Sequence, residues 1–228
     1  MNSFKKYLPL ILLGVGILVL VLVFVLIKNK NSNNSTDPDE VQTEIAFKDR
    51  PFATLTPTKD GRYINLKIDK IVLAKVDLID YELLYSLPDG RTQGVPGTVD
   101  LNGETSFERK LLLGSESNGK SRYDEGVEDG SLTIRFRDSK GKLLAKFSTK
   151  WHMQSAADQL TSIDQNFAYV LDKAVKGDYF ITMETFGLPS EASVVAAELG
   201  PYGIFSSVDL PSGEASGWQV TSSNVFYK

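Results

Sequence analysis

The chain has 228 residues, a formal net charge of −4 and 42% hydrophobic residues, with one histidine and no cysteine. The lack of cysteine excludes disulfides, thiolate metal sites and cysteine nucleophiles. A single histidine, His152, gives no basis for a histidine metal cluster, and we therefore expect no cofactor.

Near the N-terminus, a short basic tip at residues 1–7 precedes twenty apolar, uncharged residues at 8–27. As a helix with a rise of about 1.5 Å per residue, this run is about 30 Å long, the thickness of a bilayer's hydrocarbon core. The apolar part of a signal peptide is shorter, about 7–15 residues, and no small-residue cleavage pattern follows the run. We predict an uncleaved single-pass transmembrane helix that contacts the lipid bilayer through residues 8–27.

The charges beside this run decide its orientation only in part. Lys5 and Lys6 precede it and Lys28 and Lys30 follow it, so the positive-inside rule acts in both directions. The short N-terminal tail and the long C-terminal part favour a cytoplasmic tip at residues 1–7 and a domain outside the cytoplasm. Asn, Ser and Asp dominate the residues that come next, which predicts a flexible polar linker over 28–44.

From residue 45 onward, apolar and polar residues alternate in short runs that turn residues separate. The alternation is clearest at 64–68, 81–87, 132–136 and 143–151. Asn102-Gly103 predicts a hairpin between the run that ends at Leu101 and the run that begins at Phe107. About seven strands at roughly ten-residue spacing resemble, in pattern, a β-sandwich of the immunoglobulin or fibronectin kind. We therefore expect an all-β ectodomain, with a β-sandwich domain over 45–151.

Residues 152–228 differ in charge, since three lysines stand against nine acidic residues. The pattern predicts one helical turn, over 154–163, and then strands at 167–171 and 179–183. We predict a further small β module, acidic and C-terminal, over 152–228, with extra strands on the first sandwich as the alternative. The negative charge argues against a nucleic-acid partner, because the phosphate backbone requires a basic surface.

A cationic face is the most specific feature of the alternating runs. If the apolar residues of 132–136 point to the core, the opposite positions place five cations outward. Such a face suits anionic lipid headgroups or an anionic wall polymer. The alternative is that these cations only provide solubility and protect a strand edge. The five residues are Arg135, Arg137, Lys142, Lys146 and Lys150.

Two weaker signals concern chemistry. One is a set of candidate calcium ligands at Asp124, Glu125, Glu128 and Asp129. Their spacing does not match that of a calcium-binding loop, so we prefer a solvated acidic loop and predict no metal. His152 is the only histidine available to a Ser-His-Asp triad, and no Gly-x-Ser-x-Gly motif accompanies it. We therefore expect no enzyme.

The function that these features favour is a membrane-anchored, extracytoplasmic binding or scaffolding module. An extracytoplasmic hydrolase that uses His152 is one alternative, and an accessory subunit of a membrane complex is another. The sequence itself names no ligand and no protein partner.

Overall fold

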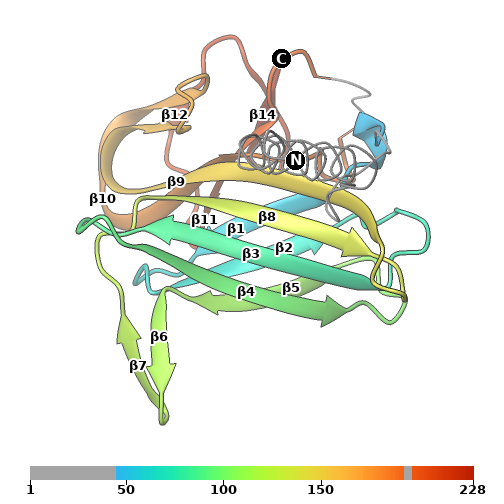
Figure 1. Cartoon of the computed structure of the whole chain (residues 1–228). Coiled ribbons are helices and arrows are strands. Elements are labelled where there is room, and N and C mark those ends of the chain that lie inside the picture. Colours follow the sequence, from blue (N-terminus) through green and yellow to red (C-terminus); the bar gives the residue numbers. More distant parts are fainter. Residues whose placement is uncertain (1–44, 193–196) are drawn as a thin grey trace, which may run out of the picture. The chain divides into compact units, whose positions relative to one another are not determined.

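The computed structural model describes residues 45–192 and 197–228, and Val41–Lys228 form one compact unit (Figure 1). The basic tip, the predicted transmembrane run 8–27 and the linker 28–44 lie outside the described residues. Among the residues that are described, no helix is long and apolar enough to cross a membrane. The described part is all-β with antiparallel sheets, as the alternating pattern predicts.

One short 3₁₀ helix and fourteen strands make up the regular structure of the described residues. They are η1 (Phe47–Asp49), β1 (Phe52–Pro57), β2 (Tyr63–Asp69), β3 (Leu78–Ser86), β4 (Thr92–Asp100), β5 (Phe107–Leu112), β6 (Gly114–Ser117), β7 (Lys120–Tyr123), β8 (Asp129–Arg137), β9 (Leu143–Thr161), β10 (Ala168–Glu184), β11 (Tyr202–Ser206), β12 (Gly213–Glu214), β13 (Gln219–Val220) and β14 (Val225–Tyr227).

These strands form a large sheet, a small sheet and a hairpin. The large sheet has nine strands in the order β13-β14-β11-β10-β9-β8-β3-β4, with β12 paired to β10. The small sheet has the order β1-β2-β5, and β6 pairs with β7 in a hairpin that projects from the rest of the unit (Figure 1). Every described pairing is antiparallel, which short turns between successive strands allow.

The main core lies between the two sheets. Alternate residues of both sheets contribute to it, for example Leu55 and Leu66 from the small sheet and Leu83, Ile134 and Trp151 from the large one, all fully buried. Burying each such side chain contributes roughly 1.5–3 kcal/mol. Because successive strand residues point to opposite faces, the residues between them are left on the outer face of the large sheet.

A second core lies on the outer side of the large sheet, where β10, β11 and β14 run. Phe180 belongs to this second core, whereas its neighbour Ile181 belongs to the main core. The same alternation separates Ile204 from Phe205. These strands are thus buried on both faces, unlike β3 and β8. The second core comprises Leu160, Phe167, Tyr169, Leu171, Phe180, Tyr202, Ile204, Ala215 and Phe226.

The predicted helical turn over 154–163 is wrong, because β9 continues as a strand to Thr161. Alanine and glutamine favour a helix locally, but Ala156 pairs with Lys176 and Leu160 pairs with Tyr169 across the β9–β10 ladder. Leu160 is thereby buried in the second core. Pairing with a distant strand overrides the local preference.

The predicted boundary between residues 151 and 152 lies within β9, so both sides of it belong to the same large sheet. The second core, in contrast, is drawn only from residues on the C-terminal side. A separate C-terminal module stays a prediction.

The predicted hairpin at Asn102-Gly103 is also wrong. Both residues have positive φ, as the sequence pair suggests, but β4 pairs with β3 and β5 pairs with β2. The turn instead carries the chain from the large sheet to the small one. The amide of Ile71 donates to the carbonyl of Thr105 at 2.9 Å and so docks the departing chain beside the end of β2.

Candidate functional site

The outer face of the large sheet carries the predicted cations. Phe136 is fully buried, whereas Arg135 lies on the other side of β8 and pairs in register with Lys146 of β9. Lys150 is exposed at an outward position of β9, opposite Ser131. Lys142 is exposed in the turn between the two strands. Strand alternation thus brings the predicted cations to one side of the hairpin.

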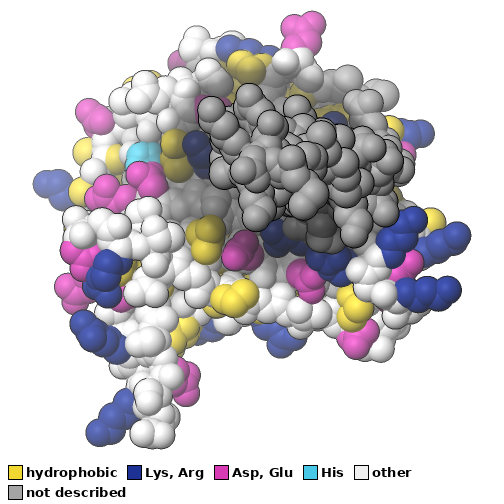
Figure 2. All heavy atoms as spheres, viewed as in Figure 1, with side chains coloured by type: hydrophobic (Ala, Val, Ile, Leu, Met, Phe, Trp, Pro, Cys, Tyr) yellow, Lys and Arg dark blue, Asp and Glu magenta, His cyan; other side chains and the backbone are white. Residues whose placement is uncertain are grey.

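Acidic residues of β3 interrupt this cationic face. Arg137 Nε lies 2.7 Å from a carboxylate oxygen of Asp80, and Arg135 Nη1 lies 3.9 Å from Glu82. Figure 2 accordingly shows basic and acidic side chains interspersed over this face. Alternation along β8 does not predict these acids, because β3 and β8, which pair directly, are about fifty residues apart in the chain. The face therefore presents mixed charge.

Three adjoining hollows at β9 together form a feature that we call the trough. Their volumes are about 360, 290 and 350 Å³. The first and second share Ser148, Thr149 and Glu184, and the second and third share Lys150 and Ile163. Because neighbouring hollows share lining residues, the trough is elongated and passes across several strands.

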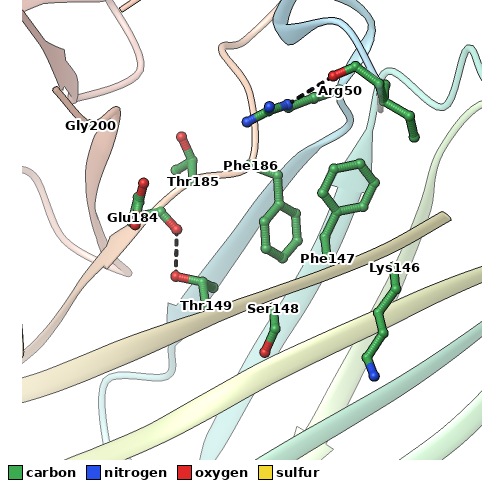
Figure 3. A pocket seen from close by; sticks show the side chains of 10 residues that line it. Arg50, Lys146, Phe147, Ser148, Thr149, Glu184, Thr185, Phe186 and Gly200 are labelled. Carbon is green, nitrogen blue, oxygen red and sulfur yellow. Dashed lines mark hydrogen bonds between the residues drawn. The ribbon is translucent and has the colours of Figure 1, made fainter. Parts of the chain in front are cut away.

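The first hollow has an aromatic wall and a cationic rim (Figure 3). The rings of Phe147 and Phe186 lie with centroids 5.2 Å apart. Nε of Arg50 donates to the carbonyl of Ile45 at 3.3 Å, which fixes the guanidinium near these rings. The side chain of Lys146 points to the opposite side of β9 from Phe147 (Figure 3). This end of the trough offers both apolar and positive surface.

Glu184 lies where the first and second hollows meet. The hydroxyl of Thr149 donates to its backbone carbonyl at 2.8 Å, so the carboxylate itself is not used by that bond (Figure 3). Burial raises the pKa of Glu184, and the charge of Asp164 raises it further, while Arg50 acts in the opposite direction. Glu184 therefore accepts a proton more readily than an exposed glutamate does.

The second hollow contains an ordered turn around Asp164. The hydroxyl of Tyr202 donates to the Asp164 carboxylate at 2.6 Å, and the hydroxyl of Ser162 donates to its other oxygen at 2.5 Å. The backbone and side-chain amides of Asn166 donate to the same carboxylate at 3.1 Å each. Partial burial raises the pKa of Asp164, but these bonds outweigh burial and lower it overall. Asp164 is thus fully engaged in holding the turn.

The candidate calcium ligands do not converge. Asp124 accepts a 2.9 Å hydrogen bond from the hydroxyl of Tyr85, and Asp129 lies toward His152. Glu125 and Glu128 are exposed in the loop between β7 and β8. Within residues 45–192 and 197–228, no three histidine, aspartate or glutamate side chains lie close enough together to hold a metal ion.

His152 is held by the far end of its own strand. Its Nδ1 lies 3.0 Å from the carbonyl oxygen of Thr161, which requires a proton on Nδ1, and Nε2 lies 3.9 Å from Asp129. In the described part of the chain, no serine hydroxyl is hydrogen-bonded to this ring. The geometry gives no support to a catalytic triad, and the absence of enzymatic activity stays a prediction.

Of the residues that line the trough, Lys146 and Lys150 are predicted from the sequence as part of the cationic face, and Asp129 as a candidate metal ligand. Four further lining residues come from separate segments of the chain, and no motif in the neighbouring sequence distinguishes them: Arg50, Asp164, Glu184 and Tyr202. The one available signal was Ser162-Ile-Asp164, a typical turn-forming stretch.

Comparison with known proteins adds no family assignment. No protein-family model matches the chain, and searches of the curated proteins and of the solved structures find no match.

Proposed function

We propose that the protein is a membrane-anchored, extracytoplasmic binding module that holds a linear anionic polymer in the trough. The observation that carries this proposal is the elongated shape of the trough, in which three hollows adjoin along β9. A chain-like ligand fills such a shape, whereas a compact ligand needs only one hollow.

The distribution of charge supports an anionic ligand. Arg50 and Lys146 line the first hollow, and Lys150 lies at the junction of the second and third. The trough has three carboxylates: Asp164 is occupied by hydrogen bonds, Glu184 has a raised pKa, and Asp129 of the third hollow lies 3.9 Å from Nε2 of His152. Cations spaced along a groove attract the repeating charges of a polymer, such as a wall polymer built of phosphate and polyol units.

Hydroxyl groups support a ligand that also carries hydroxyls. Ser148, Ser162 and Tyr202 line the second hollow, and Thr92 and Ser131 line the third. A flat anionic membrane has no group that enters such a trough, so we favour a soluble polymer over lipid headgroups. In this proposal the run 8–27 anchors the chain and the two sheets form a β-sandwich, with kinship to immunoglobulin or fibronectin domains left as a prediction.

A matched pair of double variants tests this site. The full chain is placed in discs of zwitterionic lipid and titrated with a poly(glycerol phosphate) oligomer at low salt. Replacing Arg50 and Lys150 by glutamine should raise Kd about thirtyfold, since each cation near an anionic partner contributes about 1 kcal/mol and the two together about 2 kcal/mol.

The control replaces Lys140 and Lys142, two exposed cations of the β8–β9 turn that do not line the trough. It changes the net charge equally and should raise Kd less than twofold. Equal effects of the two double variants would show diffuse attraction by the whole face, and no binding by the wild type would end the proposal.

A further inference from the structure

A second cavity, separate from the trough, lies where β1 and β2 turn and where β7 leads into β8. Its volume of about 790 Å³ exceeds that of each hollow of the trough. We call it the acidic cleft. Its walls come from the β1–β2 turn, the β7–β8 loop, the middle of β9 and Tyr179 of β10. A cavity of this size accommodates a small organic molecule.

An irregularity in the large sheet borders the acidic cleft. Lys176 pairs with Ala156 and Phe180 pairs with Gln154, so three residues of β10 lie opposite Ser155 alone. A bulge of this kind bends its strand and redirects side chains. Here it brings Tyr179, which ends the irregular stretch, into the lining of the cleft.

The β1–β2 turn is fixed against this tyrosine. Gly61 has φ +67°, and a Cβ added to it would lie 2.5 Å from the ring of Tyr179, so only glycine fits. The guanidinium of Arg62 in turn lies over the ring of Tyr123, 4.5 Å from its centroid. The cleft therefore has a pre-formed wall, and its one arginine already contacts an aromatic ring.

Carboxylates dominate the charge of the cleft. The cleft is lined by four carboxylates, those of Asp60, Asp124, Glu125 and Glu128. The one permanently charged cation among the lining residues is Arg62. Asp60 and Asp124 accept hydrogen bonds from Thr58 and Tyr85. The side chains of Glu125 and Glu128 have no hydrogen bond or ion pair among the described residues. Figure 2 shows acidic side chains beside the chain's one histidine, which also lines the cleft.

We infer that the acidic cleft binds an organic cation with several primary ammonium groups, of the polyamine class. Two carboxylates without partners among the described residues and a cavity of small-molecule size fit such a ligand. A metal ion fits less well, because no three histidine, aspartate or glutamate side chains of the described residues lie close enough together to hold one. This inference is independent of the trough and of the polymer proposed for it.

The test uses the full chain in discs of zwitterionic lipid, titrated calorimetrically with spermine at low salt. The variant with Glu125→Gln and Glu128→Gln should bind spermine about tenfold more weakly, because it loses both carboxylates that lack partners. Both side chains are exposed and have no hydrogen bond or ion pair among the described residues, so the fold should be unaffected.

The matched control is the variant with Glu104→Gln and Glu108→Gln, which removes the same charge from exposed positions at the β4–β5 turn and on β5. It should change the affinity less than twofold. The inference is overturned if the wild type does not bind spermine, if the cleft variant binds as well as the wild type, or if both variants lose affinity equally. The Arg50→Gln and Lys150→Gln variant should bind spermine at least as well as the wild type, which separates this site from the trough.

Discussion

At the scale of single residues, Asp164 is the side chain whose hydrogen bonds most clearly shape the trough. It receives donors from Ser162, Asn166 and Tyr202, and its pKa lies below the ordinary value of 3.8 as a net result. A carboxyl whose pKa is lowered by folding stabilises the folded state above its unfolded pKa. That contribution is lost as the pH falls through the folded value.

Replacing Asp164 by asparagine should lower the free energy of unfolding by about 1 kcal/mol at pH 7. The charged hydrogen bonds are weakened, and the figure is modest because the carboxylate is partly exposed to solvent. The difference between variant and wild type should begin to shrink below the unfolded pKa of about 4, and it should shrink further as the pH falls through the lower pKa of the folded carboxyl. Urea unfolding of residues 45–228 at pH 7 and pH 3 measures both quantities.

Asp158→Asn is the control for this prediction. Asp158 is exposed on β9 and has no hydrogen bond or ion pair among the described residues, so its replacement should cost less than about 0.5 kcal/mol. Equal losses in the two variants, or an Asp164 difference as large at pH 3 as at pH 7, would contradict the role given to Asp164.

At the scale of elements, the sequence predicts strands well where the pattern is local. The alternation in 132–136 correctly places Leu132, Ile134 and Phe136 in the core and Arg135 outside it. It fails where the partner is distant. The helical turn at 154–163 and the hairpin at Asn102-Gly103 are wrong because pairing with β10 and β2, respectively, decides the outcome.

In the candidate site, too, features set by neighbouring residues can be predicted, whereas features set by distant pairing cannot. Strand alternation predicts that Lys146 and Lys150 point outward, which follows from neighbouring residues alone. It cannot predict that Asp80 and Glu82 lie beside Arg137 and Arg135, because this depends on which strand pairs with β8. The trough and the acidic cleft likewise require segments that the chain brings together only on folding.

The strands that lie between the two cores should make the unfolding of both cores cooperative. Trp151 belongs to the main core, and Trp218 packs against the second core, where its ring lies 5.2 Å from that of Phe167. Because β10, β11 and β14 contribute to both cores, we expect the cores to unfold together. In the Trp218→Phe and Trp151→Phe variants, the fluorescence of the remaining tryptophan should report the main and second core respectively.

Each fluorescence transition should coincide with the loss of strand signal by circular dichroism in the same variant. Comparison within one variant removes the effect of the substitution on overall stability. A second core that melts at lower urea than the strands of the same variant would establish residues 152–228 as a separate module, as the charge division in the sequence predicts.

At the scale of the whole molecule, the composition divides the chain into an apolar N-terminal run and an all-β unit. The run at 8–27 contains no charged residue, whereas Val41–Lys228 form a compact unit with its own cores. The function that we propose includes the run as the anchor that holds the binding unit at the membrane. This link between anchor and function is open to a direct test.

The full chain should stay in the membrane pellet after washing with alkaline carbonate, because an apolar run of this length spans a bilayer. Replacing Ile17 and Leu20 by lysine places two charges at the centre of the run, at a cost of about 2.5–3.5 kcal/mol each on insertion scales. The double variant should therefore appear in the soluble fraction. Recovery of the wild type there, with an N-terminus near residue 30, would instead show cleavage and leave the all-β unit without an anchor.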